Sequence, residues 1–440
     1  MKKLFYSIIS LIFAVTLLVG LTACKGGGSD SSGEPEIDAE GNTIVKIMFH
    51  VDKSSTEGQA YQKRISAFNA AYKDKKIKAQ AIFKARTTGA SNYETELQLN
   101  LTEGTLADII TFDAPNTAAY ANSELLYDIS NLISKEEQDK FYSLNMYDGK
   151  LYGLPIQESS AGFFYNKKLF RDAGIDVSGY TAENPWTFAQ FKDVCARLQA
   201  RGITAVDMRL DATKDETATY LLYPFIYAAG GSFVSADGYT AEGYYDSAAT
   251  AKGFQFIKDL INARYTSFEI GATDFFTGKV GMYLSSGWTI PDLDNKYREY
   301  FASREDWGLL PYPKDVASAS ATGSWSYAIT NNHHPDKTAA VELLKWMTSA
   351  ESSKVVTDAT GMIPARRDVE TNYAVNSPEY TLLKQLELSG KERPVTVAYP
   401  NFSTTFGQVI YGLKSGNVAD LLRTATNTLQ SELDKLKNYR

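Results

Sequence analysis

The chain has 440 residues, and its 52 acidic residues outnumber its 45 basic residues, which gives a formal net charge of −7 at pH 7. This acidic balance argues against nucleic acid as a partner. Apolar residues make up 44% of the sequence, an ordinary proportion for a globular protein, and the length exceeds that of one average domain, so we expect two lobes.

The first residues have the pattern of a secretory signal. Lys2 and Lys3 precede an uncharged apolar run over 4–21, and small residues then stand directly before Cys24. This resembles the lipobox of bacterial lipoproteins, in which the chain is cut before the cysteine and acyl chains such as palmitate are attached to it. We therefore expect 1–23 to be a signal peptide and Cys24 to anchor the protein at the outer, extracytoplasmic face of the cell membrane. An uncleaved single-pass anchor is the alternative.

Residues 24–42 are rich in glycine and serine and carry few apolar side chains to bury. Such a composition is typical of a flexible tether. Its three consecutive glycines do not fit a phosphate-binding loop, because no strand pattern precedes them and no Gly-Lys-Ser or Gly-Lys-Thr follows. The sequence therefore predicts a lipidated tether between the anchor and the folded part of the chain.

Strand and helix patterns alternate after the tether. An apolar run at 43–49 predicts a buried strand, and a second short run lies at 107–112. Four residues at helical spacing follow the first run: Tyr61, Ile65, Phe68 and Tyr72. Alternation of this kind indicates an α/β fold with a largely parallel sheet.

Cys195 is the one cysteine left once Cys24 is acylated, so we expect no intramolecular disulfide. Thr187 and Gln190 form a capping-box pattern at the start of a predicted helix. Helical spacing places Cys195 on one face with three apolar residues: Phe191, Val194 and Leu198. We interpret Cys195 as a core thiol, because no cationic motif lies nearby to activate it.

Several short motifs occur in the order typical of one protein family. They are Leu-Tyr-Gly-Leu-Pro at 151–155, Phe-Tyr-Asn-Lys-Lys-Leu-Phe at 164–170, Ala-Gly-Ile at 173–175, Pro-Trp-Thr at 185–187, Ala-Gly-Gly at 229–231, Phe-Thr-Gly-Lys-Val-Gly-Met at 276–282 with Gly-Trp at 287–288, Trp-Gly at 307–308, and Gly-Met-Ile-Pro-Ala at 361–365. On these motifs the chain resembles the extracellular solute-binding proteins (family 1) of carbohydrate ABC importers, and it is similar to maltodextrin-binding proteins.

The resemblance implies an α/β, two-lobe, periplasmic-binding-protein-like fold with a ligand cleft between the lobes and a three-segment hinge near Gln157, Leu310 and Ser349. The implied lobes are an N-terminal lobe of 43–157 and 310–349 and a C-terminal lobe of 158–309 and 350–440. It also implies a monomer that captures a carbohydrate and delivers it to importer permease subunits, with no cofactor and no metal. Aromatic residues make up 12% of the chain, which favours an oligosaccharide.

A sugar presents an apolar C–H face and a ring of hydroxyl groups, so its site needs aromatic planes beside polar groups. Trp288 follows an apolar strand pattern at 280–284 through a glycine-containing turn, where the family places a sugar-stacking tryptophan. Trp325 follows a Ser/Ala-rich segment and precedes another apolar strand pattern. We expect both indoles to stack on ligand, and a place in the core is the alternative for each.

Polar candidates lie at the ends of predicted strands. Asp52 and Lys53 match the polar loop that contacts ligand in maltodextrin-binding members, and solvated loop charge is the alternative. Asp113 is a hydroxyl acceptor after the second strand, or forms an Asx turn onto Pro115. Glu158 lies at the first predicted crossing. Arg366, which follows Ile-Pro-Ala at 363–365, is a candidate donor of two hydrogen bonds to the ligand, with Arg367 beside it as the alternative. Asn401 and Phe402 lie where the family brings a late aromatic residue to the site.

Two other classes of protein compete with a binding protein. A secreted glycoside hydrolase would need two carboxylates flanking one bond, and no motif singles out such a pair. A metal hydrolase is disfavoured because His50, His333 and His334 do not form the His-Glu-x-x-His spacing, and no nucleophile-elbow or Walker motif is present. A surface adhesin that binds no small molecule is the other alternative. We predict a binding protein and not an enzyme.

Overall fold

The computed structural model describes residues 35–86, 93–213 and 215–437, which lie within one compact unit. The predicted signal peptide, Cys24 and the tether up to residue 34 fall outside the described residues. Strand β1, Thr43–Phe49, and helix α1, Thr56–Ala71, confirm the first predicted strand and helix. Among the described residues, no helix is long and apolar enough to cross a membrane.

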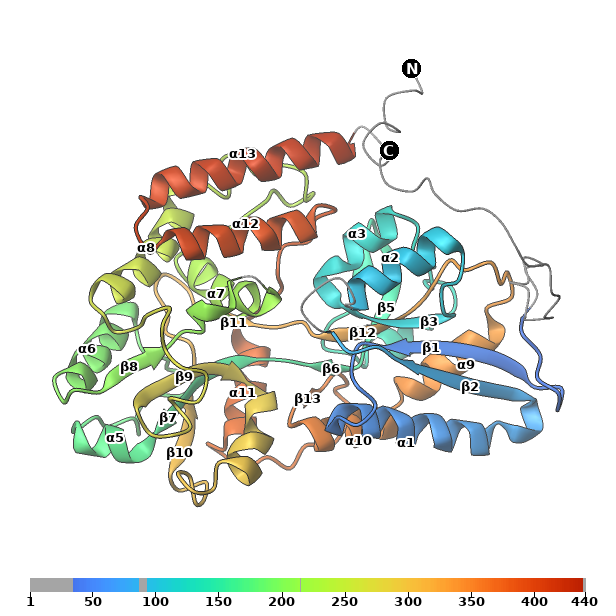
Figure 1. Cartoon of the computed structure of the whole chain (residues 1–440), viewed down its shortest axis with the longest axis horizontal. Coiled ribbons are helices and arrows are strands. Elements are labelled where there is room, and N and C mark those ends of the chain that lie inside the picture. The colour runs from blue at the N-terminus through green and yellow to red at the C-terminus, as the bar shows by residue number, and fades with distance from the viewer. Residues whose placement is uncertain (1–34, 87–92, 214, 438–440) are drawn as a thin grey trace, which may run out of the picture. The chain divides into compact units, whose positions relative to one another are not determined.

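Six strands form one mixed sheet in the order β2-β1-β3-β12-β5-β4 (Figure 1). Their bounds are Ile77–Phe83 for β2, Ile109–Asp113 for β3, Asn145–Tyr147 for β4, Lys150–Pro155 for β5 and Trp325–Ile329 for β12. Strand β1 is parallel to β2 and β3, whereas β12 is antiparallel to β3 and β5, and β4 is antiparallel to β5.

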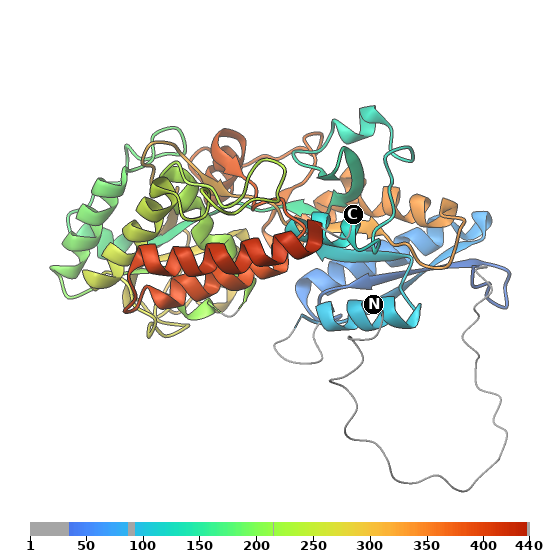
Figure 2. The ribbon, with the colours of Figure 1, turned by 90° about the horizontal axis from the view of Figure 1, so that it is seen from above.

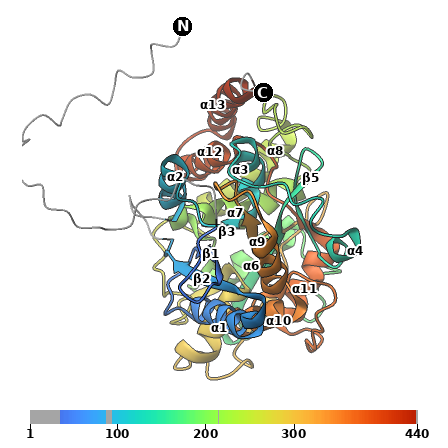
Figure 3. The same ribbon diagram turned by 90° about the vertical axis from the view of Figure 1, so that its right-hand side faces the viewer.

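Different helices cover the two faces of this sheet (Figure 3). Successive side chains of a strand point to opposite faces, so Val45, Ile47 and Phe49 join one buried cluster and Met48 joins the other. The first cluster packs against α1, α9 and α10, and the second against α2 and α3. The bounds are Tyr93–Glu103 for α2, Thr117–Asn122 for α3, Lys135–Gln138 for α4, Thr338–Met347 for α9 and Ala350–Thr360 for α10.

A second sheet has four strands in the order β10-β7-β9-β8. Their bounds are Ala161–Asn166 for β7, Thr204–Asp207 for β8, Val280–Ser286 for β9 and Trp307–Leu310 for β10. Only the β8–β9 pair of this sheet is parallel. The expectation of a largely parallel sheet is therefore wrong. The chain returns from the second sheet to the first in the opposite direction, which inserts β12 between β3 and β5 as an antiparallel strand.

The helices around the second sheet bury one large apolar cluster. They are Lys167–Asp172 for α5, Phe188–Gln199 for α6, Glu216–Ala228 for α7, Ala248–Asn262 for α8, Tyr399–Gly412 for α12 and Val418–Lys437 for α13, and the last two pack against each other (Figure 2). Helix α11, Pro378–Ser389, contributes Leu382 to a separate apolar cluster with Phe164 and Trp307. Thr187 and Gln190 form the predicted capping box of α6. Cys195 is buried in the large apolar cluster, which confirms the predicted core thiol, and burial raises the pKa of its thiol.

Short elements complete the fold. Strand β6, Gln157–Glu158, lies between β5 and β7 and pairs with β13, Ile363–Pro364. Strand β11, Ser320–Ala321, lies between β10 and β12 and pairs with β14, Gly390–Lys391. Single helical turns lie at Lys73–Lys75 (η1), Ala114–Asn116 (η2), Leu210–Ala212 (η3), Gly287–Thr289 (η4) and Asp292–Lys296 (η5).

The predicted lobe limits stay a prediction. The packing of the segment after Ser349 argues against the limit at that residue. Helix α10 follows that residue and packs on α1 of the six-stranded sheet. The buried guanidinium of Arg64 on α1 donates to Ser352, at 2.8 Å, and lies 2.6 Å from the Glu351 carboxylate. The segment directly after Ser349 therefore packs with the first sheet.

Candidate functional site

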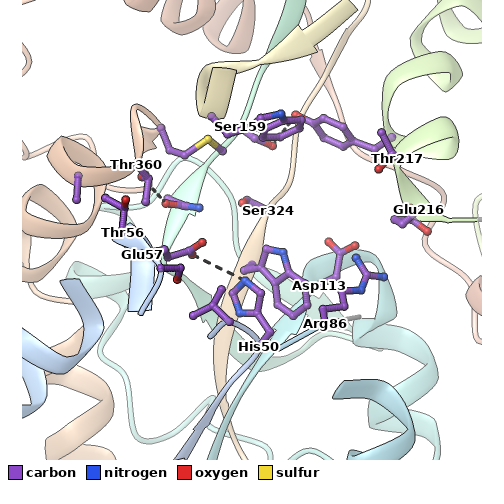
Figure 4. A pocket seen from close by; sticks show the side chains of 18 of the residues that line it. His50, Thr56, Glu57, Arg86, Asp113, Ser159, Glu216, Thr217, Ser324 and Thr360 are labelled. Atoms are coloured by element: carbon purple, nitrogen blue, oxygen red, sulfur yellow. Dashed lines mark hydrogen bonds and ion pairs between the residues drawn. The ribbon is translucent and has the colours of Figure 1, made fainter. Parts of the chain in front are cut away.

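A cavity of about 610 Å³ lies where the two sheets' strand ends and connecting segments meet (Figure 4). Its first wall comes from the segments after β1 and β2, the start of α1, the end of β3 and the start of β12. Its second wall comes from the start of α7 and from η4 and η5. The volume is in the usual range for small-molecule sites, about 300–1,000 Å³.

Strand direction explains how the first wall forms. The parallel strands β1 and β3 end at the same edge of the sheet, which places His50 and Asp113 there. Strand β12 is antiparallel to β3, so it begins where β3 ends, and Trp325 pairs directly with Asp113. Ligand crevices are common at the carboxyl ends of parallel strands. The sequence order of these residues gives no sign that they are neighbours.

Trp325 is held by other rings on this wall. The imidazole of His50 stacks on the indole with ring centroids 3.4 Å apart and planes 4° apart, so it covers one face of Trp325. Tyr93 meets the indole edge-on at 6.0 Å, and the Arg86 guanidinium carbon lies 5.5 Å from its centroid. Trp325 is half-buried as a result.

His50 is itself fixed by hydrogen bonding. Its Nδ1 lies 3.0 Å from the Thr111 hydroxyl, and its Nε2 lies 3.8 Å from a Glu57 carboxylate oxygen (Figure 4). Burial, with the charge of Arg86, lowers the pKa of His50 well below its usual value, so the ring is neutral at neutral pH. Burial raises the pKa of Glu57, although Tyr61 donates a hydrogen bond to it and works against that rise.

Trp288 on the second wall is far more open. Its side chain is 43% exposed, and it lies beside Tyr220 of α7 with ring centroids 5.7 Å apart. Tyr220 donates a hydrogen bond to Ser159 at 2.7 Å, which fixes its position in the cavity wall. The preceding Gly287 is needed for the close approach of this turn, because a Cβ there would lie 2.3 Å from the Gly361 carbonyl oxygen.

A buried charge cluster joins the two walls. Arg393 is 3% exposed, and its two terminal nitrogens donate to the two oxygens of Asp113 at 3.0 and 2.7 Å. One of them also donates to Glu216 at 2.7 Å. Glu216 accepts further hydrogen bonds from Tyr399 and from Ser403. Burial raises the pKa of Glu216, and the charge of Arg393 works against that rise.

The structure brings four of the predicted site residues to the cavity: Asp52, Asp113, Trp288 and Trp325. Asp113 does not form the alternative Asx turn, because its side chain accepts no hydrogen bond from the turn that follows it; both carboxylate oxygens accept from Arg393. Whether these residues bind ligand stays a prediction.

The other predicted site residues lie elsewhere. Lys53 is exposed and is not part of the cavity lining. Glu158 is fully buried behind the lining and accepts hydrogen bonds from Ser143, Thr322 and the Gly323 N–H, while burial raises its pKa. A carboxylate enclosed in this way is placed to support the wall and not to meet a ligand.

The structure also places Arg366, Asn401 and Phe402 outside the cavity lining, contrary to the prediction. The Arg366 guanidinium donates hydrogen bonds to Asp368, Glu137 and the Thr348 carbonyl, so its donors are engaged within the protein. Phe402 is fully buried and packs on other rings of the second core, and Asn401 beside it on α12 is exposed outside the cavity. Aromatic type alone did not distinguish a core ring from a cavity ring.

Sequence reasoning missed seven cavity residues that carry charge or an aromatic ring: His50, Glu57, Arg86, Glu216, Tyr220, Asp292 and Arg393. His50 could have been found, since it directly follows the first strand. Arg393 and Glu216 had no such signal, because they are 177 residues apart and meet only through the packing of α7 against the C-terminal segment. Within the described residues, no group of three His, Cys, Asp or Glu side chains is arranged to hold a metal ion.

Comparison with known proteins agrees with this geometry. The family model of the bacterial extracellular solute-binding proteins matches residues 52–354. A binding protein of Brucella abortus is 26% identical over 58% of this chain and 61% of its own length, so the aligned part spans less than two thirds of that relative. The diacetylchitobiose binding protein DasA of Streptomyces coelicolor is 24% identical over 84% of each chain.

A solved structure shows the same fold. The cyclic alpha-maltosyl-1,6-maltose binding protein of Arthrobacter globiformis superposes with a TM-score of 0.74 at 22% identity, covering 90% of this chain and 100% of that chain. The predicted α/β periplasmic-binding-protein fold is thereby confirmed.

Proposed function

Since the chain belongs to the bacterial extracellular solute-binding protein family, we propose that it captures an oligosaccharide in this cavity and delivers it to an ABC importer. One observation carries the choice of ligand: Trp288 presents an open indole face in a cavity whose polar groups are mainly carboxylates and hydroxyls. An aromatic plane suits the C–H face of a sugar ring, and carboxylates accept hydrogen bonds from its hydroxyl groups. The family is one of solute-binding proteins, in agreement with the prediction that the chain is not an enzyme.

The relatives support the ligand class. Two of the proteins that this chain resembles are described as binding diacetylchitobiose and a cyclic maltosyl-maltose, and both ligands contain more than one sugar unit. The cavity of about 610 Å³ is large enough for a ligand of that kind. We infer that the ligand is an oligosaccharide.

Ligand capture would act by closing the two walls on each other. A ligand shifts an open–closed equilibrium only through its different affinity for the two forms, so it must contact both walls at once. Asp52 and Trp325 lie on the first wall and Trp288 on the second, which meets this requirement. The hinge would include Gln157, which lies between β5 of the first sheet and β7 of the second. It would also include the chain between Ala321, which still packs in the second core, and β12 of the first sheet. The closed form is then what the importer recognises, with the binding protein acting as a monomer.

The experiment is a thermal-shift screen of the protein from residue 35 onward against neutral oligosaccharides, with product analysis on every sample. A ligand that binds the folded state stabilises it by RT ln(1 + [L]/Kd), so a hit raises the melting temperature and leaves the sugar intact. Cleavage of the sugar would instead indicate a glycoside hydrolase. An unchanged melting temperature with every sugar would favour the surface adhesin that binds no small molecule. Small-angle scattering of a hit should then show a smaller radius of gyration with ligand than without it.

We also propose that lipid on Cys24 holds the protein at the outer face of the cell membrane. The support is the small-residue sequence before Cys24 and the Gly/Ser-rich segment after it. Several acyl chains on one residue give stable anchoring, at about 0.8 kcal/mol per buried methylene. Cys24→Ser is therefore expected to move the protein from the membrane fraction to the medium. A variant that stays in the membrane fraction after the same wash would contradict the anchor.

A further inference from the structure

The charges that line the cavity are strongly unequal. Its carboxylates come from five residues: Asp52, Glu57, Asp113, Glu216 and Asp292. Its cationic side chains are those of Arg86 and Arg393, and among the described residues that line it there is no lysine. His50 adds no positive charge at neutral pH, because burial lowers its pKa.

Both guanidinium groups are already paired with carboxylates of the protein. Arg393 donates to Asp113 and to Glu216, with all three bonds between 2.7 and 3.0 Å. The Nε of Arg86 lies 2.6 Å from Glu94, a residue that is not part of the lining. An anionic group on a ligand would therefore have to share any cation here with a carboxylate of the protein.

The surplus carboxylates face the cavity from both walls. Asp52 is exposed on the first wall, and hydrogen bonds from Ser54 lower its pKa, which keeps it ionised. Asp292 is exposed on the second wall, where η5 begins. A ligand that contacts both walls at once cannot avoid one carboxylate by moving toward the other.

We propose that this cavity selects oligosaccharides without acidic groups and rejects those that carry a uronate, sulfate or phosphate. The inference rests on the proposed function and narrows its ligand class. Neutral hydroxyl groups can donate hydrogen bonds to Asp52 and Asp292. An anionic group on the ligand would instead lose its hydration and be repelled by carboxylates on both walls, and the arginines of the cavity are already paired with carboxylates of the protein. Like-charge opposition of this kind is how a binding site excludes a close analogue.

The test compares matched sugar pairs by calorimetry at an ionic strength of about 0.15 M, where the Debye length is about 8 Å. The probes are maltotriose, cellotriose, mannotriose and galactotriose, each beside the same trimer with one C6 oxidised to a carboxylate. We expect the oxidised form of the neutral trimer that binds to bind at least tenfold more weakly. A uronate trimer that binds as tightly as its neutral partner, or more tightly, overturns the charge inference and leaves the sugar-binding function intact. Binding of no trimer in either form counts against the proposed function itself.

A charge variant distinguishes the effect of the carboxylates in the cavity from the effect of the protein's net charge. Asp52→Lys replaces a surplus carboxylate of the lining by a cation and should narrow the neutral-to-uronate affinity ratio at least threefold. Its matched control is Asp74→Lys, which makes the same charge change on an exposed residue beyond the far end of α1. Helix α1 has 16 residues and spans about 24 Å, so Asp74 lies well outside the Debye length of the site at ordinary salt.

The control variant should keep the wild-type ratio of affinities. If both variants narrow the ratio equally, the discrimination comes from the net charge of the protein and the inference is wrong. If neither variant narrows it, Asp52 does not face the ligand's charge and the inference fails for this wall. Melting of both variants without ligand checks that each is folded.

Discussion

The two walls of the cavity each present a tryptophan, and the two side chains are held in opposite ways. Trp325 is half-buried, with His50 stacked on one face at 3.4 Å and Tyr93 against its edge. Trp288 is 43% exposed and has Tyr220 beside it at a tilt of 46°. The first wall therefore offers a fixed support, and the second wall offers an open aromatic plane.

The difference shows that a tryptophan at a strand end is not by itself a binding residue. Trp288 and Trp325 look alike in the sequence, since each adjoins an apolar strand pattern and follows a glycine by one or two residues. What separates them is His50, which follows a strand more than two hundred residues away in the chain. A stacking platform needs a free face, and that property depends on which other element packs against the ring.

The largest expected effect comes from breaking the link between the walls. Arg393→Met leaves Asp113 and Glu216 as two carboxylates without their shared cation in a buried position. Removing one partner of a buried ion pair destabilises a protein by about 3–5 kcal/mol, because the remaining charge has lost its compensation. Urea unfolding of the protein without ligand measures this change in the free energy of unfolding.

Arg201→Met is the matched control for that variant. Arg201 is exposed and lies after the end of α6, so its loss should change the free energy of unfolding by less than about 0.5 kcal/mol. Equal stability of the Arg393→Met variant and the control would show that the cluster does not hold the walls together.

The two tryptophans are expected to differ in sugar affinity. Trp288→Ala should weaken binding of the neutral trisaccharide by about 1–3 kcal/mol, the size of a buried aromatic contact, with little change in melting without ligand. Trp325→Ala should cost less than about 1 kcal/mol in affinity, because His50 already covers one of its faces. Calorimetric titration of both variants with the neutral trisaccharide measures the two losses of affinity. A larger loss for Trp325→Ala would reverse the comparison between the walls.

Local sequence patterns predicted much of the fold. The strand at 43–49, the capping box of Thr187 and Gln190 and the core position of Cys195 all follow from periodicity and capping, which act over a few residues. The family motifs predicted the periplasmic-binding-protein fold. Strand direction was not predictable in this way, because β12 enters the sheet beside β3 after more than two hundred intervening residues.

The site was predictable only where a residue lies at a strand end or within a few residues of one. Asp52, Asp113 and Trp288 lie at or just after the ends of β1, β3 and β9, and Trp325 begins β12. Phe402 and Arg366 were misplaced because their surroundings come from distant segments: the aromatic core of the second sheet for Phe402, and Glu137 with Asp368 for Arg366. Residue type and local position carry no information about such partners.

The smallest expected effect concerns the support of Trp325 and depends on pH. His50 is buried and neutral, with Arg86, Glu57, Tyr61 and Tyr93 around it, and its pKa in the folded state is far below its value of about 6.5 in an unfolded chain. Below pH 6.5 the proton therefore binds to the unfolded chain and not to the folded protein, so stability falls as the pH falls. At pH 5.5 this group lowers the free energy of unfolding by about 1.4 kcal/mol.

The variant His50→Gln removes that titration while keeping a side chain that can hydrogen-bond to Thr111. Urea unfolding of the wild type and the variant at pH 7.5 and 5.5 should show that the wild type loses about 1.4 kcal/mol more than the variant between the two pH values. Comparing the two proteins cancels the contribution of the carboxylates whose pKa burial raises, such as Glu57 and Glu216, because both proteins contain them. If the two proteins lose stability equally, His50 takes up its proton in the folded state. In that case the ring on Trp325 would be a cation at pH 5.5, and the first wall would not be the fixed, neutral support that distinguishes it from the wall of Trp288.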